Sequence, residues 1–281
     1  MIRFRCYRRS EDLTPIVKDV DIVRYAQAIL ADYSPSHLEA PAWFNADHFI
    51  EHYLNANVDV QYIYTDSRDD LIAAAAIFNL QKVRVFDKEN RCTADIIVPP
   101  NTVLIDNWTE ENSPFGFKEF TMMHEAGHLL MHQDVFKREP EKGFYGLDNG
   151  SIAARTVTPS AALCKRSMMG RYRWNLITSE DFREHQANTF AGAMLMPPRT
   201  FIPYVRDLIY GLGYNSGIYT VFKNDSSYKA GMDLKLLSNK AARKFGVSRS
   251  AAKVQIMKYG LFTHVTDFSE ARRKCMLYMN L

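Results

Sequence analysis

The side chains best placed for chemistry in this 281-residue chain lie in the segment F-T-M-M-H-E-A-G-H-L-L-M-H. It contains the pattern H-E-x-x-H at His124, Glu125 and His128. Residues four apart share one face of a helix, so two imidazoles can hold one ion while the glutamate stands beside it. A catalytic zinc ion takes three protein ligands and keeps one position for water, whose proton a nearby carboxylate can accept. The pattern therefore predicts a Zn²⁺ cofactor, with Glu125 as the catalytic base.

An inverted form of the motif, H-x-x-E-H, occurs at His48, Glu51 and His52. Spacing alone does not choose between the two motifs, but their surroundings do. Residues 45–54 predict an amphipathic surface helix with these three groups on its polar side. Residues 117–133 predict a helix that is apolar almost all round, and buried polar groups in such a helix need partners, which a metal supplies. We therefore expect the metal site in the second of these helices.

Glu184 is the predicted third ligand. It lies in S-E-D-F-R-E-H-Q-A-N-T-F-A-G-A-M-L-M-P-P, within a helix expected over residues 178–196. The other residues on its helix face are small enough to lie close against the histidine helix: Ala187, Asn188 and Ala191. Asp181 and His185 are the alternative ligands from the same helix.

His132 extends the histidine series of the first motif but is not expected to bind the ion. Eight helical residues rise about 12 Å, so His132 and the first histidine of the motif cannot both reach one metal. We expect His132 to lie next to the ligands or to be merely polar. A group that stabilises the oxyanion is not identified, although Tyr145, Tyr172 and His185 lie in the relevant part of the sequence.

The remaining pattern predicts an α+β fold, mostly helical, with a small antiparallel or mixed sheet. Helices are expected from the start signal Thr14-Pro15 to the residue before Ser34-Pro35 and over residues 45–54, besides the two that carry the predicted metal ligands. Strands are expected over residues 58–65, 83–87, 94–98 and 102–106. Residues 134–177 show no regular period. These expectations describe a zincin-like metallopeptidase domain over residues 1–198 and a helical C-terminal region over residues 199–281.

The C-terminal region is basic. From residue 235 to the end, ten Lys or Arg stand against two acidic residues, a net +8 that leaves −5 for the rest of the chain. Ser238 and Ser248 are placed to cap two short helices ending at Gly246 and Gly260, a helix-turn-helix-like pair over about 238–260. Its basic residues could bind phosphate: Lys240, Arg243, Lys244, Arg249, Lys253 and Lys258. For this pair, packing onto the rest of the protein or holding a protein substrate is favoured over direct nucleic-acid binding.

Composition and cysteine use predict a folded protein of the cytoplasm. The chain is 47% hydrophobic and 24% charged, as globular proteins are. No stretch approaches the ~18–20 apolar residues of a membrane span, and no signal-peptide pattern follows the basic N-terminal residues. The four cysteines form no C-x-x-C pair, so neither a zinc ribbon nor a dense disulfide framework is expected.

Three ordered segments of the chain resemble the ImmA/IrrE-like zinc metallopeptidases. They are F-T-M-M-H-E-A-G-H-L-L-M-H, E-H-Q-A-N-T-F-A-G-A-M-L-M-P and F-G-V-S-R-S-A-A-K-V-Q-I-M-K-Y-G-L, and the likeness covers about residues 102–261. The resemblance implies His124 and His128 as zinc ligands, Glu125 as catalytic base and Glu184 as third ligand. It also implies a cytoplasmic bacterial or phage peptidase that cuts a DNA-binding transcriptional repressor.

The leading hypothesis is thus a zinc endopeptidase, in which the metal polarises the scissile carbonyl and Glu125 moves a proton from water to the leaving amine. The competing hypothesis is a DNA- or protein-binding regulator that works through its basic C-terminal helices and holds a structural zinc. Four protein ligands that close the site would favour the regulator, whereas three ligands and a water position would favour the peptidase.

Overall fold

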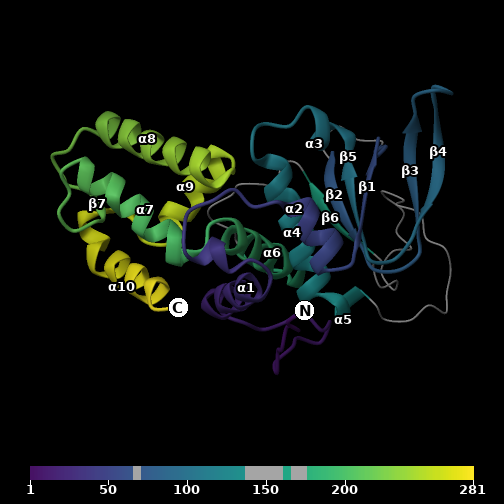
Figure 1. The fold of residues 1–281 in the computed structure, drawn as a ribbon, viewed down its shortest axis with the longest axis horizontal. Coiled ribbons are helices and arrows are strands. Elements are labelled where there is room, and N and C mark those ends of the chain that lie inside the picture. The colour runs from purple at the N-terminus through teal and green to yellow at the C-terminus, as the bar shows by residue number, and fades with distance from the viewer. Residues whose placement is uncertain (66–70, 137–160, 166–175) are drawn as a thin grey trace.

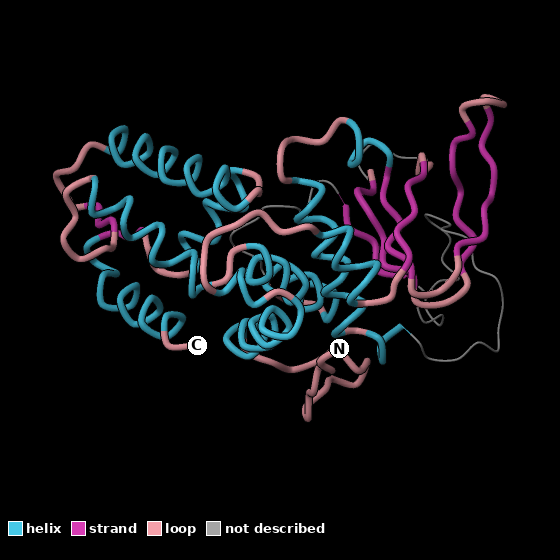
Figure 2. Tube along the Cα trace, in the orientation of Figure 1, coloured by secondary structure: helices cyan, strands magenta, loops and turns pink. Residues whose placement is uncertain are grey.

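The computed structural model describes residues 1–65, 71–136, 161–165 and 176–281, and the prediction of a mixed helix and sheet fold is confirmed (Figures 1 and 2). The helices are α1 (Asp19–Tyr33), α2 (Ala46–His48), α3 (Asn107–Glu111), α4 (Phe117–Met131), α5 (Gln133–Phe136), α6 (Ser179–Leu195), α7 (Pro198–Gly211), α8 (Ser227–Phe245), α9 (Arg249–Lys258) and α10 (Phe268–Met279). The strands are β1 (Asn57–Gln61), β2 (Ile72–Ile77), β3 (Gln81–Asp87), β4 (Cys92–Val98), β5 (Thr102–Asp106), β6 (Ala161–Lys165), β7 (Tyr219–Val221) and β8 (Phe262–His264).

The largest sheet is mixed and lies at one end of the molecule. Its strand order is β1-β5-β2-β6, with β1 parallel to β5 and β2 antiparallel to both of its neighbours. The hairpin β3–β4 lies beside it, α1, α4 and α6 occupy the middle, and α7 to α10 form the other end (Figure 1). The helix α4 therefore has sheet on one side and helix on the other, which places its side chains in the interior.

Two strands of this sheet are absent from the sequence-based expectation. Every residue of β2 is buried, because its two faces are covered and it pairs on both edges. A strand buried on both faces shows no alternation of polar and apolar residues, so the period that reveals strands is missing. The edge strand β6 lies inside the stretch 134–177 that was expected to be irregular.

Two expected helix starts are wrong. The first helix begins at Asp19 rather than after Thr14, because Pro15 instead bridges to Arg9 in an extended turn. The helix expected to start at Ser238 already begins at Ser227, and the Ser238 hydroxyl donates to the carbonyl of Leu234 within it at 2.6 Å.

Three other helix predictions are confirmed. Thr178 and Asp181 form a reciprocal capping box that starts α6. Ser248 caps α9, since its hydroxyl accepts from the backbone N–H of Ala251 at 3.1 Å. The segment expected over 45–54 is helical in two pieces, α2 and a π-helical turn over Phe49–Tyr53.

The turn between α8 and α9 packs against the start of α4 and against the segment before α2. Gly116, at the start of α4, has φ +71° and lies so close to the backbone of Val247 and Ser248 that a Cβ would overlap it. Gly246 is covered in the same way by the Trp43 ring. The hydrophobic core runs continuously from α1 to α10. Among the described residues, no helix has the length and apolar character to span a membrane.

Candidate metal centre

The metal ligands predicted from the sequence come from two helices that touch closely. Gly127 makes this contact tight, because a Cβ there would lie 3.1 Å from the Phe190 ring and 3.3 Å from the Cα of Ala187. The small face expected on α6 is thus the face that meets α4. This close approach brings Glu184 of α6 level with His124 and His128 of α4, and all three side chains are buried.

The three predicted ligands converge on one point. The Nε2 atoms of His124 and His128 are 3.1 Å apart, and each lies 3.2 Å from a different carboxylate oxygen of Glu184. Zinc bound at ~2.0–2.1 Å in a tetrahedral site has ligand atoms about 3.3–3.4 Å apart. The three atoms therefore have nearly the spacing of one face of a zinc tetrahedron, and they form a group able to hold a metal ion.

Charges at the centre favour an ionised Glu184. Burial pushes its pKa up, but the two imidazoles outweigh burial and the net pKa is lowered. Burial also pushes down the pKa of His124, but there the charge of Glu184 wins and the pKa is raised. For His128 burial prevails and the pKa is lowered. A carboxylate and a neutral imidazole are the forms that bind a metal, so Glu184 and His128 are already in suitable forms. His124, whose pKa is raised, would release a proton when a metal binds.

Glu125 lies on the side of α4 that faces the sheet, next to the ligands but outside their triangle. It is fully buried, and neither carboxylate oxygen accepts a regular hydrogen bond within the described part of the chain. Burial, reinforced by the negative charge of Glu184, raises the pKa of Glu125 to about 8. The backbone N–H of Ala76 is close enough to lower this pKa somewhat, but it does not satisfy the whole carboxylate. A buried carboxylate with so few hydrogen bonds is costly, and a water, an ion or a substrate group beside it would stabilise it.

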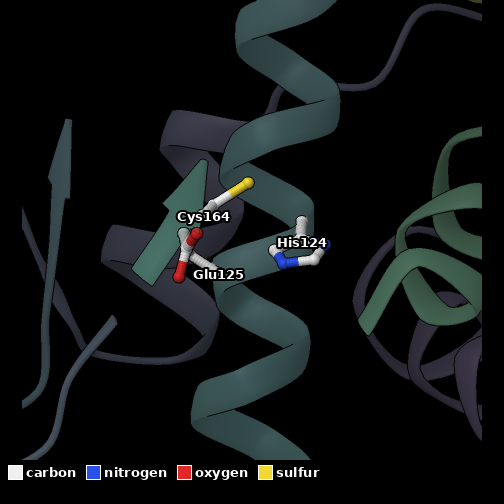
Figure 3. Close-up of side chains that lie close together, drawn as sticks. All are labelled: His124, Glu125 and Cys164. Carbon is white, nitrogen blue, oxygen red and sulfur yellow. The ribbon is translucent and has the colours of Figure 1, made fainter. Parts of the chain in front are cut away.

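Cys164 is a residue of this site that sequence reasoning missed. It lies on β6 and directs its sulfur toward α4, close to His124 and Glu125 (Figure 3). One potential ligand atom from each of these three residues lies within 4.8 Å of the others, which defines a second group able to hold a metal. The group with Glu184 has donor atoms only 3.1–3.2 Å apart and contains the three predicted ligands, so we favour it as the ligand set. Nothing in the sequence pattern marked Cys164, because it is a single cysteine in a stretch without periodicity.

The ligand rings are each held through their other nitrogen. The Nδ1 of His124 lies 3.2 Å from Oδ1 of Asn188, and the Nδ1 of His128 lies 3.0 Å from Nδ1 of His132. His132 thus contacts one of the two predicted histidine ligands, as the first of the two expectations for it has it. Burial lowers the pKa of His132 well below its ordinary range.

The alternative ligands have other partners. The Nε2 of His185 lies 2.8 Å from Asp19 on α1, and Asp181 serves the capping box of α6. The inverted motif over 48–52 lies on an exposed surface, where the Nδ1 of His48 is 2.6 Å from the hydroxyl of Tyr33. No metal-binding group forms there within the described ranges. Tyr145 and Tyr172 lie outside the described residues.

The basic residues of the C-terminal pair divide into two sets. Lys258 donates to Asp19 on α1 at 2.9 Å and to the Thr189 hydroxyl on α6 at 2.6 Å, so it joins three helices. The other five are exposed on the surface: Lys240, Arg243 and Lys244 on α8, and Arg249 and Lys253 on α9.

No protein-family model and no curated protein matches the sequence. A solved structure described as a Mycobacterium tuberculosis transcriptional regulator aligns with 85% of this chain and 47% of its own, at 13% identity and a TM-score of 0.38. The chain therefore spans about half the length of that protein. A likeness this distant leaves the function to be argued from the site itself.

Proposed function

We propose that this protein is a zinc-dependent endopeptidase with a zincin-like centre, in which His124, His128 and Glu184 hold the metal. The observation that carries the proposal is the convergence of these three donors at 3.1–3.2 Å with a buried carboxylate, Glu125, next to them. Three ligands leave a fourth tetrahedral position for water, as in catalytic rather than structural zinc sites.

Zinc and Glu125 would have distinct roles in peptide hydrolysis. When bound, zinc would supply a Lewis acid for the scissile carbonyl and the attacking water, and a positive charge that favours the carboxylate form of Glu125. Glu125 would accept the proton of the attacking water at a carboxylate oxygen and deliver it to the leaving amine nitrogen. The apolar surroundings of Glu125 would keep other water away, which strengthens these interactions.

The resemblance to the ImmA/IrrE-like metallopeptidases supports the same reading and extends it to a substrate class. On that basis the substrate would be a protein, specifically a DNA-binding transcriptional repressor in the same cytoplasm. The competing regulator hypothesis requires a closed structural site, and the favoured ligand set offers three protein donors rather than four.

The test is the Glu125→Gln variant. It keeps the shape of the side chain but removes the basic oxygen, so we expect zinc to stay bound while peptide cleavage falls by about 10²–10⁴-fold. Zinc is measured by elemental analysis, and cleavage with a fluorescence-quenched library of unstructured peptides followed by mass spectrometry of the products.

Glu119→Gln is the matched control, since Glu119 lies in the first turn of the same helix and outside the group that could hold a metal. It should cleave like the wild-type protein. Equal cleavage by Glu125→Gln, or a zinc-loaded wild-type protein that cleaves no peptide, would contradict the proposal.

A further inference from the structure

A chain of buried side-chain contacts runs from the metal centre to the segment before α1. It starts at His128, whose Nδ1 lies 3.0 Å from Nδ1 of His132. The other ring nitrogen of His132, Nε2, lies 2.9 Å from Oε1 of Gln186 on α6. The amide nitrogen of Gln186 donates at 2.7 Å to the backbone carbonyl of Pro15. All three side chains are buried, so solvent cannot replace any of these partners.

The far end fixes the direction of every hydrogen bond in this chain. The carbonyl of Pro15 can only accept, so the NH₂ of Gln186 must face it and the Gln186 oxygen must face His132. That oxygen can only accept as well, so Nε2 of His132 carries a hydrogen. In a neutral imidazole the other nitrogen is then an acceptor, and Nδ1 of His132 receives the N–H of His128 Nδ1.

The direction of these hydrogen bonds determines which nitrogen of His128 is free to bind a metal. If Nδ1 of His128 carries the hydrogen, its Nε2 holds a lone pair, and this is the nitrogen 3.2 Å from Glu184 at the point where the ligands converge. A free neutral histidine exchanges between its two tautomers, and in only one of them can Nε2 bind a metal. The hydrogen-bond chain thus selects the metal-binding form before any metal arrives.

We propose that His132 is a positioning residue that holds His128 in its metal-binding tautomer and orientation. The inference rests on the proposed metal centre and adds a function for a side chain that is itself too far along α4 to be a ligand. Asn188 plays the same role for His124, because its Oδ1 lies 3.2 Å from the Nδ1 of His124 and can accept its N–H. The two ligands therefore have independent supports, and loss of His132 should affect His128 alone.

The direct test uses the metal-free wild-type protein with ¹⁵N-labelled histidine. Long-range ¹H–¹⁵N correlation spectra distinguish the two tautomers of each ring. We expect the Nδ1–H form for His128 and the Nε2–H form for His132. The opposite forms, or an equal mixture at His128, would overturn the proposal without any variant being made.

Variants then connect the tautomer with metal binding. His132→Phe keeps a planar ring but removes the acceptor, and we expect a mixture of tautomers at His128 and zinc affinity about 10–100-fold weaker, measured by competition with a chromophoric chelator. His132→Asn is the rescue, because its Oδ1 takes the place of the ring Nδ1, as Asn188 shows for the other ligand. It should restore most of the affinity.

Gln186→Leu tests the same chain without a change at His132, and it should also weaken zinc binding. Unchanged tautomers and unchanged zinc affinity in a folded His132→Phe or Gln186→Leu protein would overturn the inference while leaving the peptidase proposal intact. Conversely, the expected tautomers in a wild-type protein that binds no zinc would support the positioning role and count against the proposed function.

Discussion

At the scale of single residues, the centre depends on one carboxylate that faces two imidazoles. Glu184 is almost fully buried, and both of its oxygens are directed at the histidine nitrogens. The convergence of these three residues was predictable, because the i, i+4 spacing of the histidines and the small residues around Glu184 both have direct geometric meaning. Cys164 was not predictable, because its place beside Glu125 results from strand pairing between segments far apart in the sequence.

Glu184→Ala should lose the metal. Removal of the carboxylate leaves two neutral donors with no charge to balance the cation, so zinc content should fall from about one per chain to a small fraction of that. Elemental analysis of the purified proteins measures this. Glu180→Ala provides the control, since Glu180 is an exposed residue of the same helix, and it should keep the wild-type content. Retention of zinc in Glu184→Ala would assign the third ligand elsewhere.

Cobalt distinguishes the two groups that could hold a metal. With the ligand set of two histidines and Glu184, the Co²⁺-loaded protein should show no sulfur-to-cobalt charge-transfer band in the near ultraviolet, and Cys164→Ser should leave its spectrum unchanged. A band in the wild-type spectrum that disappears in Cys164→Ser would show that the thiolate binds, and would favour the group formed with Glu125.

At the scale of elements, the strands that were missed are those that lack a local signal. β5 was predicted with its observed bounds, whereas β2, its partner, consists largely of alanines, which favour helices in isolation. Tertiary burial on both faces decides its conformation. Helix α6 was predictable because a capping box starts it and Pro197-Pro198 follows its end. Helix α4 has no side-chain cap at its start and was predictable from its long apolar helical pattern. The start of α8 was not predictable, because Ser238 resembles a cap but lies mid-helix.

Substitution of Gly116 tests the close packing between the start of α4 and the turn between α8 and α9. Its left-handed φ disfavours any side chain, and a Cβ would overlap the backbone of Val247, so Gly116→Ala should lower the free energy of unfolding by about 1–3 kcal/mol. Thermal unfolding followed by circular dichroism measures this. Gly231→Ala is the counterpart: this glycine lies within α8 with open space around its Cα, and the substitution should stabilise by about 0.5–1 kcal/mol. Equal effects of the two changes would contradict the packing described here.

At the scale of the whole molecule, the C-terminal helices are tied to the metal centre by polar as well as apolar contacts. Asp19 on α1 receives His185 from α6 and Lys258 from α9. The expected division at residue 198 stays a prediction about independent folding, but a charge network that spans both sides of it could not be read from the sequence. It joins residues more than 230 positions apart, and no local pattern records such a pairing.

The Asp19 network should make stability depend on pH in a defined direction. Burial pushes the pKa of Asp19 up, but the hydrogen bond from His185 and the charge of Lys258 outweigh it and lower the pKa in the folded protein. The stabilisation is therefore complete above the unfolded pKa of about 3.9, and it is lost progressively as the pH falls from there through the lower pKa of the folded protein. Asp19→Asn should cost about 1–3 kcal/mol at neutral pH and progressively less below pH ~4 in urea titrations. A constant difference across that range would exclude the ionised form of Asp19 as the cause.

The exposed basic residues of α9 should be dispensable for the metal centre. Lys258 is engaged by Asp19, so Arg249 and Lys253 are the side chains of this helix that remain directed to solvent. The double change Arg249→Ala and Lys253→Ala should leave zinc content and peptide cleavage unchanged. Fluorescence anisotropy with duplex DNA at two salt concentrations should show only weak, sequence-independent binding in the wild type. Specific binding that the double variant abolishes would favour the regulator hypothesis.

Truncation of the chain before α1 would remove the Pro15 carbonyl, which accepts a hydrogen bond from Gln186. The residues before α1 form no helix and only one isolated bridge, and they resemble a tail that could be trimmed to improve crystals or to place an affinity tag. Yet this segment is hydrogen-bonded to α6. Gln186 donates to the carbonyl of Pro15, and Arg183 donates to Asp12 and Thr14. A fragment that starts at α1 would lack the acceptor that orients Gln186. Poor zinc retention by such a fragment would therefore not count against the proposed metal centre of the full chain.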